Sequence, residues 1–184
     1  MDFKQTLLLI INELNNSRID YGLIGGFAMG LFGIDRATTD LDFLINIKDI
    51  DKIKKIFLEN GYELLFYSDN VLQFVSPIKD FGEIDIIIAK REISLNMLKN
   101  TIEKTILENS INIKILMPED IIGLKLQAIK NDKEREAIDR NDIKYLMKNF
   151  SLDNDRIKKY ADLLNMDQYF EKILLEVNLE KWWD

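Results

Sequence analysis

The chain has 184 residues, of which 47% are hydrophobic, and 25 basic and 32 acidic residues give it a formal net charge of −7. This length and composition fit one globular domain with a small helical addition. The acidic balance disfavours sequence-independent binding of nucleic acid over a broad face. Histidine and cysteine are both absent, which excludes disulfides, thiolate nucleophiles, histidine bases and most zinc sites. Catalysis would therefore depend on carboxylates, Lys, Arg, Tyr, hydroxyl groups and hard metal ions.

The N-terminal segment carries no targeting or membrane signal that we recognise. No apolar run approaches the roughly 18 residues that span a bilayer, and MDFKQT lacks the basic-then-apolar order of a signal peptide. We therefore expect a cytoplasmic protein with no membrane partner.

Residues 2–15 place apolar side chains on one helical face, which predicts an amphipathic helix packed on the core.

The next stretch, GGFAMGLFGIDRATTDLDFL, organises the rest of the sequence. Residues 21–24 predict a short strand that runs into Gly25-Gly26 and then into a helical stretch over 27–32. Paired glycines at a strand-to-helix turn allow close backbone approach to a phosphate. Residues 40–45 are β-branched and apolar apart from two acids, which predicts a strand entering a core.

Asp40 and Asp42 of this strand point to the same face, because strand side chains alternate. Two adjacent carboxylates repel each other, and a divalent cation such as Mg²⁺, which prefers oxygen ligands, removes the conflict. A tight turn followed by an exposed acidic strand end is the alternative for these features. For the stretch as a whole we favour a nucleotide and metal site.

Gly-Gly, a short helix and a hydrophobic-Asp-hydrophobic-Asp-hydrophobic strand resemble the nucleotidyltransferase superfamily that includes DNA polymerase β. The form here, GGFA followed by GIDRATTDLD, is most similar to the AbiEii-like branch of abortive-infection toxins. The resemblance implies that Asp40 and Asp42 hold one or two Mg²⁺ (or Mn²⁺) ions and that Gly25 and Gly26 cradle the phosphates of an NTP substrate.

Two more residues of this stretch are candidate phosphate or site ligands. Arg36 could bind phosphate bidentately, although it could equally be a surface arginine paired with Asp35. Thr38 could contribute a hydroxyl group.

Further along, residues 48–60 predict a helix that Gly61 ends in the left-handed conformation. Residues 62–67 and 71–76 then predict a hairpin. Residues 81–89 are strongly β-branched and predict a central strand, yet they contain Asp85, an acid that is costly to bury without a partner. An exposed strand end is the alternative. In the family that the chain resembles, a third acid on such a strand ligates metal or serves as base; this role falls on Asp85, with Glu83 on the same face as the weaker candidate.

The segment after this strand predicts a short helix over 93–99, then a second hairpin or strand plus loop over 101–116, with a helix as the alternative for 102–107. Pro118-Glu119-Asp120 predicts the start of a helix over 118–131. Lys125 in this helix could be an ordinary surface lysine. The resemblance implies instead that it faces the nucleotide phosphates, since PEDIIGLK stands where the family has a similar helix.

Asp139-Arg140-Asn141-Asp142 predicts the start of another helix and resembles the family's fourth motif, without its usual Arg-Asp adjacency. The choice between Asp142 and Asp139 as a nucleotide-site residue stays open, and so does a simple capping role. Residues 125–148 hold seven basic and five acidic side chains, a patch that could receive an RNA end or the nucleotide.

Residues from 151 onward predict helices, with Asp153 as a cap and Asp167 starting the last one. Trp182-Trp183 could anchor on the core or contact a partner.

Together these features predict an α/β nucleotidyltransferase fold, a mixed sheet flanked by helices over residues 1–148 with a helical extension over 149–184. The resemblance, over about residues 20–148, implies Mg²⁺-dependent transfer of NMP from an NTP to a hydroxyl acceptor. The acceptor could be tRNA or protein, for a toxin with a cognate antitoxin, or a small molecule, for an aminoglycoside- or lincosamide-type antibiotic nucleotidyltransferase. A non-catalytic nucleotide-binding protein of the same family is a third hypothesis. The chain could also form a homodimer.

Overall fold

The computed structural model describes residues 3–35, 37–78, 81–106 and 111–180. It divides into two compact units, residues 1–116 and residues 117–184. The expected division after residue 148 falls inside helix α6 (Glu136–Asn149) and stays a prediction. Over the described ranges, no helix has the length and apolar character needed to cross a bilayer.

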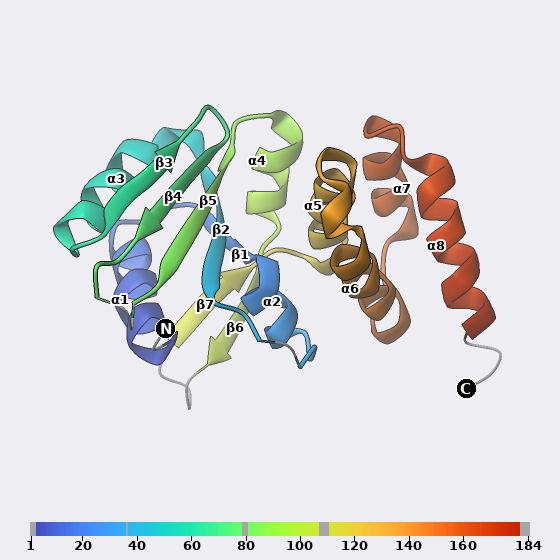
Figure 1. The fold of residues 1–184 in the computed structure, drawn as a ribbon, viewed down its shortest axis with the longest axis horizontal. Helices are drawn as coiled ribbons and strands as arrows, with labels where there is room; N and C mark the ends of the chain where they lie inside the picture. The colour runs from blue at the N-terminus through green and yellow to red at the C-terminus, as the bar shows by residue number, and fades with distance from the viewer. Residues whose placement is uncertain (1–2, 36, 79–80, 107–110, 181–184) are drawn as a thin grey trace. The chain divides into compact units, whose positions relative to one another are not determined.

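The first unit is built on a seven-stranded mixed sheet, ordered β3-β4-β5-β2-β1-β7-β6 (Figure 1). Strands β2 and β5 are parallel, as are β1 and β7, and the other neighbours are antiparallel. This arrangement confirms the expected mixed α/β fold. The strands are β1 (Tyr21–Ile24), β2 (Asp40–Asn46), β3 (Glu63–Tyr67), β4 (Val71–Val75), β5 (Glu83–Ala89), β6 (Ile102–Ile106) and β7 (Ile111–Ile115).

Helices cover both sides of this sheet (Figure 1). On one side lie α1 (Phe3–Asn16) and α3 (Ile50–Glu59), and the ring of Phe57 in α3 packs 4.8 Å from that of Phe74 in β4. On the other side lie α2 (Gly25–Leu31) and α4 (Glu92–Lys99). The side chains facing α1 and α3 form the larger part of the apolar core, which fixes the register of the strands.

Most of the predicted elements of this unit are confirmed, with small shifts at their ends. The helix expected from residue 48 begins at Ile50, after a 3₁₀ turn (Ile47–Asp49), and Gly61 has the expected positive φ of 81°. Both hairpins form, so the helix alternative for residues 102–107 is wrong for the described residues 102–106. Alternating exposure along β6 explains the outcome, since it suits an edge strand better than a helix.

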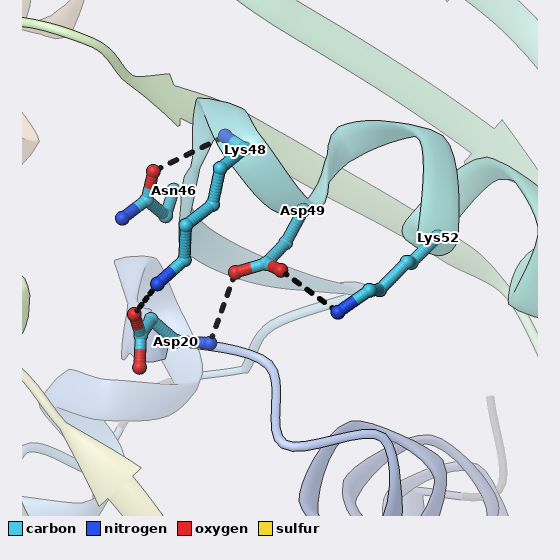
Figure 2. Close-up of polar contacts among 5 residues, drawn as sticks. All are labelled: Asp20, Asn46, Lys48, Asp49 and Lys52. Atoms are coloured by element: carbon cyan, nitrogen blue, oxygen red, sulfur yellow. Dashed lines mark hydrogen bonds and ion pairs between the residues drawn. The ribbon is translucent and has the colours of Figure 1, made fainter.

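A cluster of charged side chains holds the turn between β2 and α3 against the start of β1 (Figure 2). The buried carboxylate of Asp49 accepts a hydrogen bond from the backbone N–H of Asp20 (3.4 Å) and pairs with Lys52 (3.4 Å). Lys48 pairs with Asp20, which raises the pKa of the lysine. Asn46 accepts from the Lys48 backbone N–H at 3.1 Å. These contacts stabilise the end of β2 that lies away from Asp40.

The second unit is helical, with α5 (Pro118–Asn131), a 3₁₀ turn (Lys133–Arg135), α6, α7 (Asn154–Leu163) and α8 (Asp167–Glu180). Asp153 caps α7 as expected, accepting from the Arg156 backbone N–H at 3.0 Å. Helix α6 begins three residues before Asp139. A Cβ at Gly123 would lie 2.5 Å from the Tyr160 ring, so this glycine permits α5 and α7 to pack closely. Trp182 and Trp183 lie outside the described residues.

Candidate active site

The acids of the first unit meet because β2 and β5 are parallel neighbours in the sheet. Their register pairs Asp42 with Asp85 and Asp40 with Glu83. Oxygen atoms of Asp40, Asp42 and Asp85, one from each residue, all lie within 4.8 Å of one another, and the three side chains are half-buried. The structure thus brings together the three carboxylates that the sequence analysis singled out. Glu83 lies beside this group without belonging to it.

Alternation along β2 explains why the carboxylates lie on one face. Leu41 and Phe43 are fully buried on the opposite face, so burying them forces Asp40 and Asp42 onto the other. The same alternation in β5 buries Ile84 and Ile86 and leaves Asp85 half-buried. The apolar core therefore dictates the acid cluster.

Gly25 lies directly against the Asp42 carboxylate, at the junction of β1 and α2. Its φ is +67°, in the left-handed region that favours glycine. A Cβ built on Gly25 would lie 1.8 Å from Asp42 Oδ2, a distance that no real Cβ contact has. The Asp42 carboxylate therefore occupies the place that the Cβ of any other residue would take.

Two neutral side chains hold the outer carboxylates of the cluster. Thr38 donates its hydroxyl hydrogen to Asp40 Oδ1 at 2.9 Å. Gln73 of β4 donates its amide hydrogen to Asp85 Oδ1 at 3.1 Å, and strand pairing places Gln73 directly beside Asp85. The sequence analysis did not identify Gln73. In the sequence, Gln73 is a single polar residue between Leu72 and Phe74. Its contact with Asp85 follows only from the pairing of β4 with β5.

A surface hollow of about 500 Å³ is lined by residues of α2 and of the segment between α2 and β2. It includes Gly26 and Thr38, two of the predicted nucleotide-site residues. Arg36, a third, lies outside the described residues. The full lining is Gly26, Phe27, Gly30, Leu31, Gly33, Ile34, Asp35, Ala37 and Thr38.

Lys125 and Asp142, predicted to lie at the nucleotide site, meet inside the second unit. The Lys125 Nζ lies 2.7 Å from Asp139 Oδ1 and 2.6 Å from Asp142 Oδ2, and all three side chains are buried. Arg135 pairs with the other oxygen of Asp139 at 3.0 Å. Both Asp139 and Asp142 thus belong to one cluster around Lys125, and the choice between them as a nucleotide-site residue stays open. Their roles toward a nucleotide stay predictions.

A buried acid of α5, Asp120, faces α7. It accepts hydrogen bonds from Arg156 (2.7 Å) and from the hydroxyl of Tyr160. Burial raises the pKa of Asp120, although these hydrogen bonds and the positive charge of Arg156 oppose the shift. Burial also raises the pKa of Tyr160 to about 12. This network cross-links helices within the second unit and leaves the acid cluster of the sheet as the candidate active site.

Comparison with known proteins supports the fold through structure alone. No protein-family model and no curated protein sequence matches the chain. Among solved structures, the antibiotic-resistance factor ANT(2″)-Ia aligns over 100% of both chains with a TM-score of 0.64 and 10% identity. The lincosamide antibiotic adenylyltransferase LnuA, bound to lincomycin, aligns over 79% of this chain and 97% of its own, with a TM-score of 0.55 and 15% identity.

An antigenic nucleotidyltransferase-like protein from Paracoccidioides brasiliensis is also similar, with a TM-score of 0.59 and 18% identity over 94% of this chain and 92% of its own. At such identities the likeness establishes the fold and leaves the activity to be argued from the site. None of these comparisons singles out the AbiEii-like branch. The chain has the fold of the nucleotidyltransferases, with a cluster of three aspartates on neighbouring strands of its sheet.

Proposed function

We propose that this protein is a metal-dependent nucleotidyltransferase, which transfers NMP from an NTP to a hydroxyl group of an acceptor. The observation that carries the proposal is the placement of Asp40, Asp42 and Asp85 on adjacent parallel strands, with Gly25 against the Asp42 carboxylate. The structural likeness to nucleotidyltransferases supports it.

The donor set fits a hard divalent cation such as Mg²⁺ or Mn²⁺. The cluster offers carboxylate oxygens from Asp40, Asp42 and Asp85 within 4.8 Å of one another, and Mg²⁺ is bound in proteins by carboxylates together with water and phosphate. Glycine at position 25 permits the backbone to approach the Asp42 carboxylate closely. A cation held there would neutralise the triphosphate and stabilise the departing pyrophosphate.

The reaction we infer forms a bond between the acceptor oxygen and the α-phosphorus, and breaks the bond from the α-phosphorus to the oxygen that leaves with pyrophosphate. The acceptor hydroxyl loses a proton, and we assign its uptake to Asp85, whose carboxylate Gln73 orients. Gly25 and Gly26 would receive the β- and γ-phosphates, and Thr38 would orient Asp40. Lys125, Asp142 and Arg36 are proposed, from the resemblance, as further contacts for the nucleotide.

The direct test is transfer of radiolabel from each of four α-³²P NTPs, with Mg²⁺ or Mn²⁺, to total RNA, protein or small molecules in a cell lysate. We expect Asp42→Asn and Asp85→Asn to lower transfer at least about 100-fold, as removal of groups that stabilise transition-state charge does. The matched control is Asp69→Asn, which changes an exposed aspartate in the turn between β3 and β4. Full transfer by the Asp42 and Asp85 variants would refute the mechanism.

Two biological roles follow from different acceptors. In the toxin role, suggested by the AbiEii-like residues, the acceptor is tRNA or protein, and expression without a cognate antitoxin arrests growth in an Asp42-dependent way. In the resistance role the acceptor is a drug. The structural likeness to ANT(2″)-Ia, seen elsewhere in complex with adenylyl-2″-tobramycin, and to LnuA favours testing this second role. Growth in the presence of tobramycin or lincomycin distinguishes it from toxicity.

Binding of Mg-NTP without transfer to any acceptor would instead support a non-catalytic nucleotide-binding protein. Mass measurement by light scattering would decide whether a homodimer forms. The binding measurement and the mass measurement use the same purified protein.

A further inference from the structure

The carboxylate cluster continues into a second patch across β4 and β3. Strand pairing aligns two transverse rows of side chains on the face that carries the cluster. One row runs from Asp42 and Asp85 through Gln73 to Phe66. The other runs from Asp40 and Glu83 through Val75 to Glu63. Directly paired residues on neighbouring strands project to the same face, so Phe66 and Glu63 share the face of the cluster.

The β3–β4 half of this face is exposed and partly apolar. Phe66 is 50% exposed, and Leu65, the extra residue of a bulge in β3, is 66% exposed. On β4 the opposite face is closed, because Leu72 and Phe74 are at most 1% exposed, whereas Leu64 and Tyr67 on that face of β3 are 38% and 56% exposed. Exposed aromatic and aliphatic side chains grouped beside a reactive centre are typical of ligand-binding surfaces.

The charged side chains that strands β2, β3, β4 and β5 bring to this face are all negative. Strands β2, β3, β4 and β5 contain no lysine or arginine. Glu83 and Glu63 are exposed and lie outside the group of three carboxylates. Cations bound by the three aspartates would therefore leave Glu83, beside the cluster, and Glu63, two strands further along, as negative charges on this face. Such a surface repels a phosphate backbone and attracts an amine.

We propose that the β3–β4 half of this face, here called the acceptor platform (Glu63, Leu65, Phe66, Gln73 and Val75), binds the acceptor and selects a small cationic hydroxyl compound over an RNA end. This inference rests on the proposed function and specifies its substrate class. Neighbouring strands lie about 4.8 Å apart, so Phe66 stands two strands, about 10 Å, from Asp85. An acceptor of two or three rings can span that distance, with its hydroxyl at the cluster, its body over Phe66 and an amine near Glu63.

The test measures binding of two probes to the full-length protein by calorimetry, with Mg²⁺ and the non-hydrolysable ATP analogue AMPCPP. The probes are tobramycin, an amine-rich polyol, and its fully N-acetylated derivative, which keeps the hydroxyl groups and loses the positive charge. We expect tobramycin to bind at least about 10-fold more tightly. Phe66→Ala and Glu63→Lys should each weaken its binding about 5-fold or more, because a cation–π or charge contact is lost.

Two matched variants control for general effects on the sheet. Leu64→Ala truncates a β3 side chain that pairs with Phe74 on the opposite face, and Glu103→Lys reverses an exposed charge on β6 at the other edge of the sheet. We expect both to bind tobramycin as the wild type does, and all four variants to bind AMPCPP unchanged. Equal binding of the charged and the acetylated probe would overturn the inference, as would unchanged tobramycin binding by Phe66→Ala and Glu63→Lys.

Transfer of radiolabel separates the failure of the platform from the failure of the proposed function. Charge-dependent binding that needs Phe66, without transfer to any acceptor, would support the platform and refute the enzyme. Label that enters tRNA equally in the wild type, Phe66→Ala and Glu63→Lys would support the enzyme and overturn the platform.

Discussion

Gly25 is the residue at which the backbone itself shapes the candidate site. It combines a positive φ of 67° with the approach of its Cα to the Asp42 carboxylate. Either feature alone would favour glycine, and together they leave no space for another side chain. The Gly-Gly pair noticed in the sequence thus acquires a specific steric reason, which concerns the acid cluster as much as a bound phosphate.

We predict that Gly25→Ala lowers both stability and transfer activity. The added methyl group must displace Asp42 or shift the end of β1, and the strained φ adds to this, for a total of roughly 2 to 4 kcal/mol. Gly30→Ala is the matched control in the same helix, because a Cβ there meets nothing within 4 Å. We expect that control to be neutral or stabilising by about 0.5 to 1 kcal/mol. Urea unfolding of both variants provides the measurement, and a Gly25→Ala protein as stable and active as Gly30→Ala would contradict the steric argument.

At the scale of elements, helix α5 carries three buried charged groups, Glu119, Asp120 and Lys125. Asp120 faces Arg156 and Tyr160 of α7, and Lys125 faces Asp139 and Asp142 of α6. Asp120 and Lys125 each have a partner of opposite sign, as burial in a medium of low polarity requires, whereas Glu119 accepts a hydrogen bond from the Asp153 backbone N–H at 3.0 Å. The helical pattern of the sequence located α5 correctly, and these pairs explain how its polar residues are accommodated among apolar neighbours.

We predict that Lys125→Met destabilises the second unit by about 3 kcal/mol or more, because it removes the ammonium group that both Asp139 and Asp142 contact in a buried site. Gln127→Met, at an exposed position of the same helix, should change stability by less than about 0.5 kcal/mol. Unfolding in urea, followed by far-UV circular dichroism, gives both values. A variant that retains wild-type stability but has a raised KM for NTP would show that Lys125 serves the phosphates rather than the fold.

The same elements show how far sequence patterns extend. Alternation in β2 was sufficient to place Asp40 and Asp42 on one face, since period-two patterning is local, whereas the role of Asp85 beside them came from the resemblance to a known family and depends on the pairing of β2 with β5. Gln73 was missed because its meaning depends on the pairing of β4 with β5, which the local pattern leaves undetermined. The partners of Lys125 were missed for a similar reason, because they depend on how α5 packs against α6, and helix periodicity does not encode which residues meet across helices.

At the scale of the whole molecule, the residues proposed to act in the reaction are distributed unequally between the two units. The first unit contains all three carboxylates of the cluster, the hollow at α2 and the acceptor platform. The second contains the buried ion pairs of α5 and all seven basic residues between positions 125 and 148. The metal-dependent part of the proposed reaction therefore rests on the sheet, and the contribution proposed for the second unit is contact with the nucleotide.

Buried tyrosines in both units predict a shared response to alkaline pH. Burial raises the pKa of Tyr21 and Tyr62 in the first unit, and of Tyr160 in the second, to about 12 from 10.0. Between these values the unfolded chain has released protons that the folded protein still holds. The raised pKa values therefore contribute stability that is fully present below pH 10 and is lost as the pH rises from about 10 to 12.

Tyr21→Phe tests this prediction in one unit, because it keeps the ring that packs against Phe43 and removes the titrating hydroxyl. For the wild type we expect the free energy of unfolding to be level between pH 8 and 9 and to fall beyond pH 10, with roughly 2 kcal/mol of the loss at pH 11.5 coming from Tyr21. The variant loses the hydrogen bond to Asn15, so it starts less stable by about 1 kcal/mol, but its decline with pH should be shallower. Denaturant unfolding at each pH, with phenolate absorbance recorded in parallel, provides the comparison, and parallel declines for both proteins would show that Tyr21 does not titrate as its burial predicts.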